Sequence, residues 1–238
     1  MRWFRALLLV LCLSMLLTAC HGLGGPGEPR TASPSASVLT STNTERSASA
    51  PASPAPSSNP PAPAGTRPAL STDAQAQLDQ ELIAAAKANN VPLVKGLIAR
   101  GGNVNAKDAL QDSAFLYAGA EGLNEVLRLT LAAGADVAST NRYGGTALIP
   151  ASEHGHVETV QILIGAGVPV NHVNNLGWTA MQEAILLNNG GPRQQEVVRL
   201  LLAAGADPDI REPEGRTALQ NAERLGFAEI AAMLRGRG

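Results

Sequence analysis

A self-similarity with a period of 33 residues dominates the second half of this 238-residue chain. The segment Asn-Arg-Tyr-Gly-Gly-Thr-Ala-Leu at 141–148 returns as Asn-Asn-Leu-Gly-Trp-Thr-Ala-Met at 174–181 and as Glu-Pro-Glu-Gly-Arg-Thr-Ala-Leu at 212–219. A period of this length predicts a stacked array of supersecondary units, because one such unit cannot bury its own apolar face. Arrays of this kind present extended surfaces to their partners. The pattern therefore favours a binding protein.

Each unit carries the signals of two successive helices. Hydroxyl side chains stand where they can cap the first helix, at Ser113, Thr146, Thr179 and Thr217. Glycines precede three of them by two residues, in a turn that tolerates positive φ, at Gly144, Gly177 and Gly215. Other glycines end the second helix, at Gly101, Gly134, Gly167 and Gly205. The first helix has small side chains and the second has bulky apolar ones, such as Leu163.

The combined pattern, Asp/Asn-x-x-Gly-x-Thr-Ala-Leu-x-x-Ala followed by Gly-His-x-x-x-Val-x-x-Leu-Ile-x-x-Gly, resembles the ankyrin repeat. The resemblance covers roughly Gln75 to Leu234 and implies an all-α ankyrin-repeat solenoid of about five helix-turn-helix repeats with β-hairpin tips. The His with which the family holds its helix-start Thr is replaced by Leu, Ile or Gln, so that hydrogen bond is expected to be lost. Gln111 and Thr130 depart from the pattern and predict that the second repeat is the weakest internal one.

The expected domains are a signal peptide at 1–19, a lipidated Cys with a Pro/Ala/Ser-rich disordered tether at 20–72, and the repeat domain at 73–238. The repeats lie near 75–107, 108–140, 141–173, 174–211 and 212–238. The fourth has five extra residues within 187–193, which indicate either drift in a surface loop or an added contact element.

The amino-terminal segment predicts a membrane anchor. Arg2 and Arg5 precede an apolar run that is too short to span a bilayer. It ends in Leu17-Thr-Ala-Cys20, which resembles the lipobox of bacterial lipoproteins, and lipidation of Cys20 would anchor the protein durably. The alternative is an ordinary secretory signal. His21 after the Cys favours the outer membrane, with the repeat domain in the periplasm.

Charge and motif content argue against several function classes. From residue 73 onward there are 13 Lys and Arg against 18 Asp and Glu, a net charge of −5, and no basic stripe that would indicate nucleic-acid binding. His154 and His156 lack Cys or acidic neighbours at zinc-ligand spacing. No Gly-x-Ser-x-Gly or phosphate-binding loop is present. We therefore expect no catalytic residue, metal, cofactor or small-molecule substrate.

The tips that join successive repeats are the candidate binding site. The resemblance places variable, outward-facing residues there, and four of them form an apolar and aromatic row: Leu110, Tyr143, Leu176 and Trp178. Polar residues rim the row, at Arg142, Asn175 and Arg216. Aromatic residues and Arg are enriched in interface hot spots. The alternative is that these side chains fold back onto neighbouring tips.

These observations predict a membrane-anchored module of the bacterial envelope that binds another protein through its tips and concave face. Two more specific roles remain alternatives at this point. One is inhibition of a toxic envelope enzyme, and the other is a helper role in oxidative-stress defence.

Overall fold

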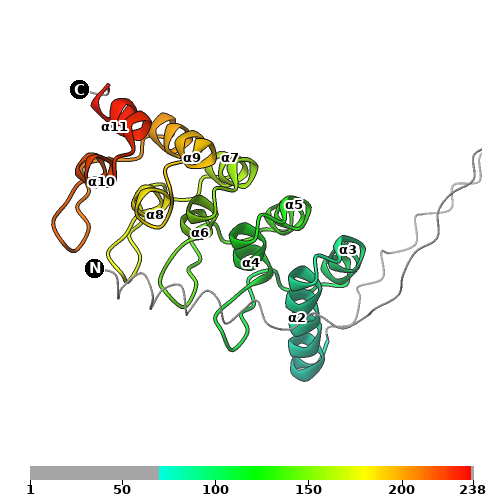
Figure 1. Ribbon diagram of the computed structural model, residues 1–238. Helices are drawn as coiled ribbons and strands as arrows, with labels where there is room; N and C mark the ends of the chain where they lie inside the picture. Colours follow the sequence, from blue (N-terminus) through cyan, green and yellow to red (C-terminus); the bar gives the residue numbers. More distant parts are fainter. Residues whose placement is uncertain (1–69, 237–238) are drawn as a thin grey trace, which may run out of the picture. The chain divides into compact units, whose positions relative to one another are not determined.

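The computed structural model describes residues 70–236, and Figure 1 shows their arrangement. Within this range the chain forms ten helices and no strand. They come in five successive pairs: α2 (Thr72–Lys87) with α3 (Val91–Ala99), α4 (Ala114–Ala120) with α5 (Asn124–Ala132), α6 (Leu148–Glu153) with α7 (Val157–Gly165), α8 (Ala180–Leu186) with α9 (Pro192–Ala203), and α10 (Ala218–Leu225) with α11 (Ala228–Arg235). The predicted signal peptide, the tether and Cys20 lie outside the described residues.

The pairs stack into two layers. The first helices of the pairs pack on one another in order from α2 to α10, and the second helices do the same from α3 to α11 (Figure 1). Small side chains let the first layer close up: Ala118, Ala151, Ala184 and Ala222 are fully buried. Gly119 allows an especially close approach within this layer, because an added Cβ would lie 2.7 Å from the Cβ of Ala147. The expected division of small and bulky residues between the layers holds only in part, because the first helices also bury large side chains such as Phe115, Met181 and Ile185.

Side-chain caps start three of the first helices as predicted. Ser113, Thr179 and Thr217 accept hydrogen bonds from backbone N–H groups three residues ahead, at 3.1, 3.2 and 3.3 Å. The predicted cap at Thr146 is wrong. Helix α6 begins at Leu148, and the buried Thr146 hydroxyl has no hydrogen-bond partner. Pro150 supplies no N–H to the Thr146 carbonyl, and the N–H of Ile149 donates to that carbonyl instead, at 3.1 Å.

The glutamines at the family's His position offset the expected loss. Gln220 completes a capping box, because its side-chain oxygen accepts from the Thr217 N–H at 2.9 Å. Gln182 donates to the Ile210 carbonyl near the end of its own repeat, also at 2.9 Å. The missing His bond is therefore replaced at these two positions.

Four five-residue loops, here called the tips, project from the first-helix layer (Figure 1). They span 108–112, 141–145, 174–178 and 212–216, and each is numbered after the repeat that it begins, from the second tip to the fifth. Each is closed by one backbone hydrogen bond from its first residue to the carbonyl of its last, as in Asn141 to Gly145 at 2.9 Å. The expected β-hairpins are thus shortened to closed turns with no assigned strand in the described range. Gln111 adopts a φ of +62° where the later tips have glycine.

The extra residues of the fourth repeat form an ordered connection between α8 and α9. The Asn188 side chain donates to the carbonyl of Glu153 in the preceding repeat at 2.7 Å. On the other side, an added Cβ on Gly190 would lie 2.5 Å from the ring of Phe227. Helix α9 also has 12 residues, against nine in α3, α5 and α7. The insertion is held between its neighbours on both sides.

Candidate protein-binding surface

Each tip is organised by the side chain of its first residue. Asp108, Asn141 and Asn174 each accept two backbone hydrogen bonds from within their own tip through one side-chain oxygen, at 2.8–3.0 Å. Glu212 does the same with its two oxygens, at 3.0 and 3.1 Å. These bonds satisfy backbone groups that a surface turn would otherwise leave to water. The tips are therefore defined structures.

Neighbouring tips also contact one another. The Asn175 N–H donates to the Tyr143 carbonyl at 2.9 Å, and the His172 ring hydrogen-bonds the Gly144 carbonyl at 2.6 Å. Farther along, an added Cβ on Gly177 would lie 2.7 Å from Cγ of Pro213. These contacts fix the register of the tips, so equivalent positions lie next to one another along the stack.

Three members of the predicted apolar row are exposed at the tips. The exposed fractions are 48% for Leu110, 39% for Tyr143 and 43% for Leu176. They belong to three successive tips and form an apolar strip, here called the tip row. Because their side chains are open to solvent, they have not folded back to fill the interior.

Trp178 differs from the expectation of an exposed tip residue. It is half-buried, and its indole nitrogen is buried without a hydrogen-bond partner. Trp178 is the last residue of its tip and precedes the buried cap Thr179. The same place in the two preceding tips is occupied by Asp112 and Gly145, and both are buried. Trp178 therefore lies at the base of its tip, whereas the tip row occupies the middle positions.

The predicted polar rim is divided in the same way. Arg142 and Asn175 are exposed, and the Arg142 guanidinium lies 4.9 Å over the Tyr143 ring. Arg142 also reaches Asp112 of the preceding tip, at 3.7 Å. The other predicted rim residue, Arg216, is half-buried, and its guanidinium binds side chains of its own repeat. It is therefore not available to contact a partner protein.

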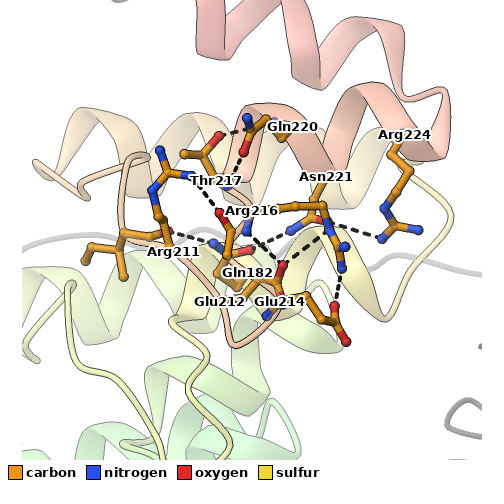
Figure 2. A network of polar contacts seen from close by, with 11 residues as sticks. Gln182, Arg211, Glu212, Glu214, Arg216, Thr217, Gln220, Asn221 and Arg224 are labelled. Atoms are coloured by element: carbon orange, nitrogen blue, oxygen red, sulfur yellow. Dashed lines mark hydrogen bonds and ion pairs between the residues drawn. The ribbon is translucent and has the colours of Figure 1, made fainter.

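Figure 2 shows the polar network that holds Arg216. Its Nε donates to Asn221 at 2.9 Å and lies 3.2 Å from Glu212, and its Nη2 contacts Glu214. Asn221 in turn donates to Gln182 of the preceding repeat at 3.3 Å. The network joins the last two repeats, and the sequence pattern gave no sign of it because its members lie up to 39 residues apart.

A second polar link fastens the first repeat, which has no tip of its own. Lys87 at the end of α2 reaches Asp108 and Asp112, at 2.6 and 3.2 Å, and lies 5.3 Å over the Tyr117 ring. Partial burial acts to lower the pKa of Lys87, but the two carboxylates outweigh it and raise that pKa. Burial acts to raise the pKa of Asp108, but the hydrogen bonds from Lys87 and two backbone N–H groups outweigh it and lower that pKa. Sequence reasoning missed this link.

The two histidines of interest have structural contacts. The His154 ring hydrogen-bonds the Ala120 carbonyl at 2.9 Å, and the His154 and His156 rings meet edge to face, with centroids 5.5 Å apart. Within 70–236, no three His, Cys, Asp or Glu side chains are grouped so that they could hold a metal ion. No helix in this part of the chain is long and apolar enough to cross a membrane.

Comparison with known proteins agrees with this geometry. The ankyrin-repeat family model matches in three overlapping copies, at 82–172, 115–212 and 151–238. A crystal structure of an ankyrin repeat domain from Acinetobacter baumannii AYE is 58% identical, with a TM-score of 0.64 over 64% of this chain and 78% of that one. The crystal structure of the ankyrin repeat protein EF0377 is 40% identical, with a TM-score of 0.63 over 65% of this chain and 78% of that one.

One curated protein matches over a shorter stretch. YahD of Escherichia coli (strain K12), described as an ankyrin repeat protein, is 48% identical over 56 residues, which are 24% of this chain and 28% of YahD. Ankyrin repeats are protein-interaction modules. The family model spans residues 82–238, about two thirds of the sequence, and this chain therefore belongs to the ankyrin-repeat family.

Proposed function

We propose that this protein is a membrane-anchored module of the bacterial envelope that binds a partner protein through the tip row. The observation that carries the proposal is the exposure of three large apolar side chains on three adjacent, internally bonded tips. Solvent-exposed apolar strips of this kind gain free energy when a partner removes them from water. Because the tips are already ordered, a partner would bind without a large ordering cost.

The composition of the tip row suits an interface core. Tyr143 offers a large, stiff ring, and the Arg142 guanidinium that lies over this ring offers hydrogen-bond donors. Asn175 supplies a further exposed polar contact. Trp178 is half-buried at the base of the fourth tip and is not part of this exposed strip. Tyr, Trp and Arg dominate measured interface hot spots.

Replacing single side chains of the tip row by alanine tests this proposal. Partners are first identified by cross-linking in native membranes, and their affinity for the purified protein is then measured. Tyr143→Ala and Leu176→Ala are expected to weaken binding by about 2 kcal/mol or more each, the threshold for a hot spot. The matched control is Leu93→Ala, since Leu93 is 47% exposed but belongs to α3 in the other layer. Equal effects of the three variants would contradict the proposal.

The membrane anchor is proposed from the segment Leu17-Thr-Ala-Cys20. Lipidation of Cys20 would leave the repeat domain on a long Pro-rich tether at the membrane surface, with the outer membrane as the proposed location. Cys20→Ser is expected to move the protein from the membrane to the soluble fraction after cell disruption. A variant that stays wholly in the membrane fraction would exclude this anchor, and density-gradient separation of the wild type decides between the two membranes.

A further inference from the structure

Helix α8 carries a buried carboxyl group that has no ion-pair partner among the described residues. Glu183 in α8 is 6% exposed, and its Oε1 accepts a hydrogen bond from the side-chain N–H of Asn174 at 2.8 Å. The positions four residues after the corresponding caps in the other repeats hold Tyr117, Pro150 and Asn221, none of them acidic. A lone buried carboxylate is costly, so this one calls for an explanation.

Asn174 connects Glu183 to the fourth tip. Its side-chain oxygen accepts from the backbone N–H groups of Leu176 and Trp178, both at 3.0 Å. Its side-chain nitrogen donates to Glu183. Asn174 is itself 7% exposed, so the position of its amide is set by these three bonds. Loss of the Glu183 bond would leave the buried amide nitrogen without that acceptor and free the tip to rearrange.

The charges around Glu183 favour its neutral form. Burial, followed by repulsion from Glu153 on α6, raises the pKa of Glu183 to about 8, although the Asn174 bond acts in the opposite direction. Burial also raises the pKa of Glu153, and the charge of His154 opposes that shift.

The nearby cations are engaged elsewhere. On the α10 side, Arg216 and Arg224 both donate to Asn221. On α9, Arg199 pairs with Glu196. Burial and the charges of His154 and Arg193 lower the pKa of His156. The neutral carboxyl of Glu183 is thus favoured by its surroundings on each side.

We propose that Glu183 is a pH-sensitive brace of the fourth tip, which holds Asn174 when the carboxyl is neutral and releases it on ionisation. The ionised group gains by turning from its buried site toward water, and this movement breaks the bond to Asn174. The tip that presents Leu176 then loosens. The consequence for partner binding rests on the function proposed above, but the change in the tip itself does not.

The direction of the pH effect follows from proton linkage. An exposed, released Glu183 titrates near 4.5, whereas the braced group titrates near 8. The braced state therefore binds more protons over this interval, so the brace is strongest below about pH 4.5 and weakens as the pH rises. Above about pH 8 both states are ionised and the effect levels off.

Amide hydrogen exchange of the full chain, measured by NMR and corrected for intrinsic rates, tests the brace without any partner. The reporters are the Leu176 and Trp178 amides. The internal control is the third tip, where the Tyr143 and Gly145 amides donate to Asn141 in the same way. Protection of the fourth tip relative to the third is expected to fall at least about tenfold between pH 5 and 8. Parallel profiles in the two tips would overturn the proposal.

Two variants separate the brace from general pH effects. Glu183→Gln keeps an acceptor for Asn174 but cannot ionise, so the relative fall in protection should disappear; its persistence would contradict the proposal. Glu153→Gln keeps Glu183 and removes the neighbouring charge, so the fall should be smaller and end at a lower pH. An unchanged profile in that variant would also count against it. Because these measurements involve no partner, they test the brace even if the binding proposal is wrong.

Discussion

At the scale of single residues, the tips depend on backbone conformations that most side chains avoid. Gly177 and Gly215 occupy the same place in the fourth and fifth tips, with φ of +80° and +81°. Their surroundings differ, because an added Cβ would approach the Pro213 ring at Gly177 and would meet nothing within 4 Å at Gly215. Substitutions at these two glycines therefore distinguish the energetic cost of backbone strain from that of a disturbed contact between tips.

Gly215→Ala is expected to lower the free energy of unfolding by about 1–2 kcal/mol, the usual cost of a left-handed alanine. Gly177→Ala should cost more, since its methyl group would also displace Pro213 and disturb the fifth tip. Chemical denaturation of both variants measures the difference. Equal costs would show that the contact between these two tips contributes nothing to stability.

At the scale of elements, asparagine side chains clamp some neighbouring repeats together. Asn105 donates to the Gly134 carbonyl at 3.0 Å and accepts from the Asp136 N–H at 2.8 Å. Asn171 makes the equivalent bonds to Gly205 and Asp207, at 3.3 and 2.8 Å. Between the second and third repeats, the corresponding positions hold Ala138 and Pro169. That junction lacks the clamp, because alanine has no amide and proline no N–H.

Asn105→Ala should lower the free energy of unfolding by about 1–2 kcal/mol, the net value of two exposed hydrogen bonds.

Building the clamp into the junction between the second and third repeats should give non-additive changes in the free energy of unfolding. Ala138→Asn alone regains at most one bond, since Pro169 cannot donate, whereas Ala138→Asn combined with Pro169→Asp regains both. A double-mutant cycle measures the coupling, and additive effects would refute the assignment of this clamp.

The features that the sequence predicted correctly are mostly local ones. Gly205 follows α9 at a φ of +84°, and Thr179 caps α8, because each needs only its own turn. The predicted cap at Thr146 is wrong for an equally local reason, namely Pro150 in the first turn of α6. The half-buried setting of Trp178 and the brace by Glu183 depend on packing between repeats, which periodicity does not encode. The tip row was predictable because equivalent positions align in any stacked array.

At the scale of the whole molecule, the described helices pack within their own repeat and against the adjacent repeats, so stability depends on these two kinds of contact. The links described above each join adjacent repeats, as Lys87 does for the first two and Asn221 for the last two. A stack of this kind behaves as a one-dimensional chain of coupled units. The position of a cavity along the stack should therefore matter as much as its size.

Leu163 and Leu234 allow that dependence to be tested. Both are buried leucines in second helices, with exposed fractions of 0% in α7 and 6% in α11, but the first is central and the second terminal. Leu163→Ala should cost about 2–5 kcal/mol through the cavity it leaves and should uncouple the two halves of the stack, which gives a broadened or biphasic denaturation curve. Leu234→Ala should fray the last repeat and leave the main transition sharp. A single sharp transition with an unchanged midpoint in Leu163→Ala would show that the central repeat does not transmit stability between the halves.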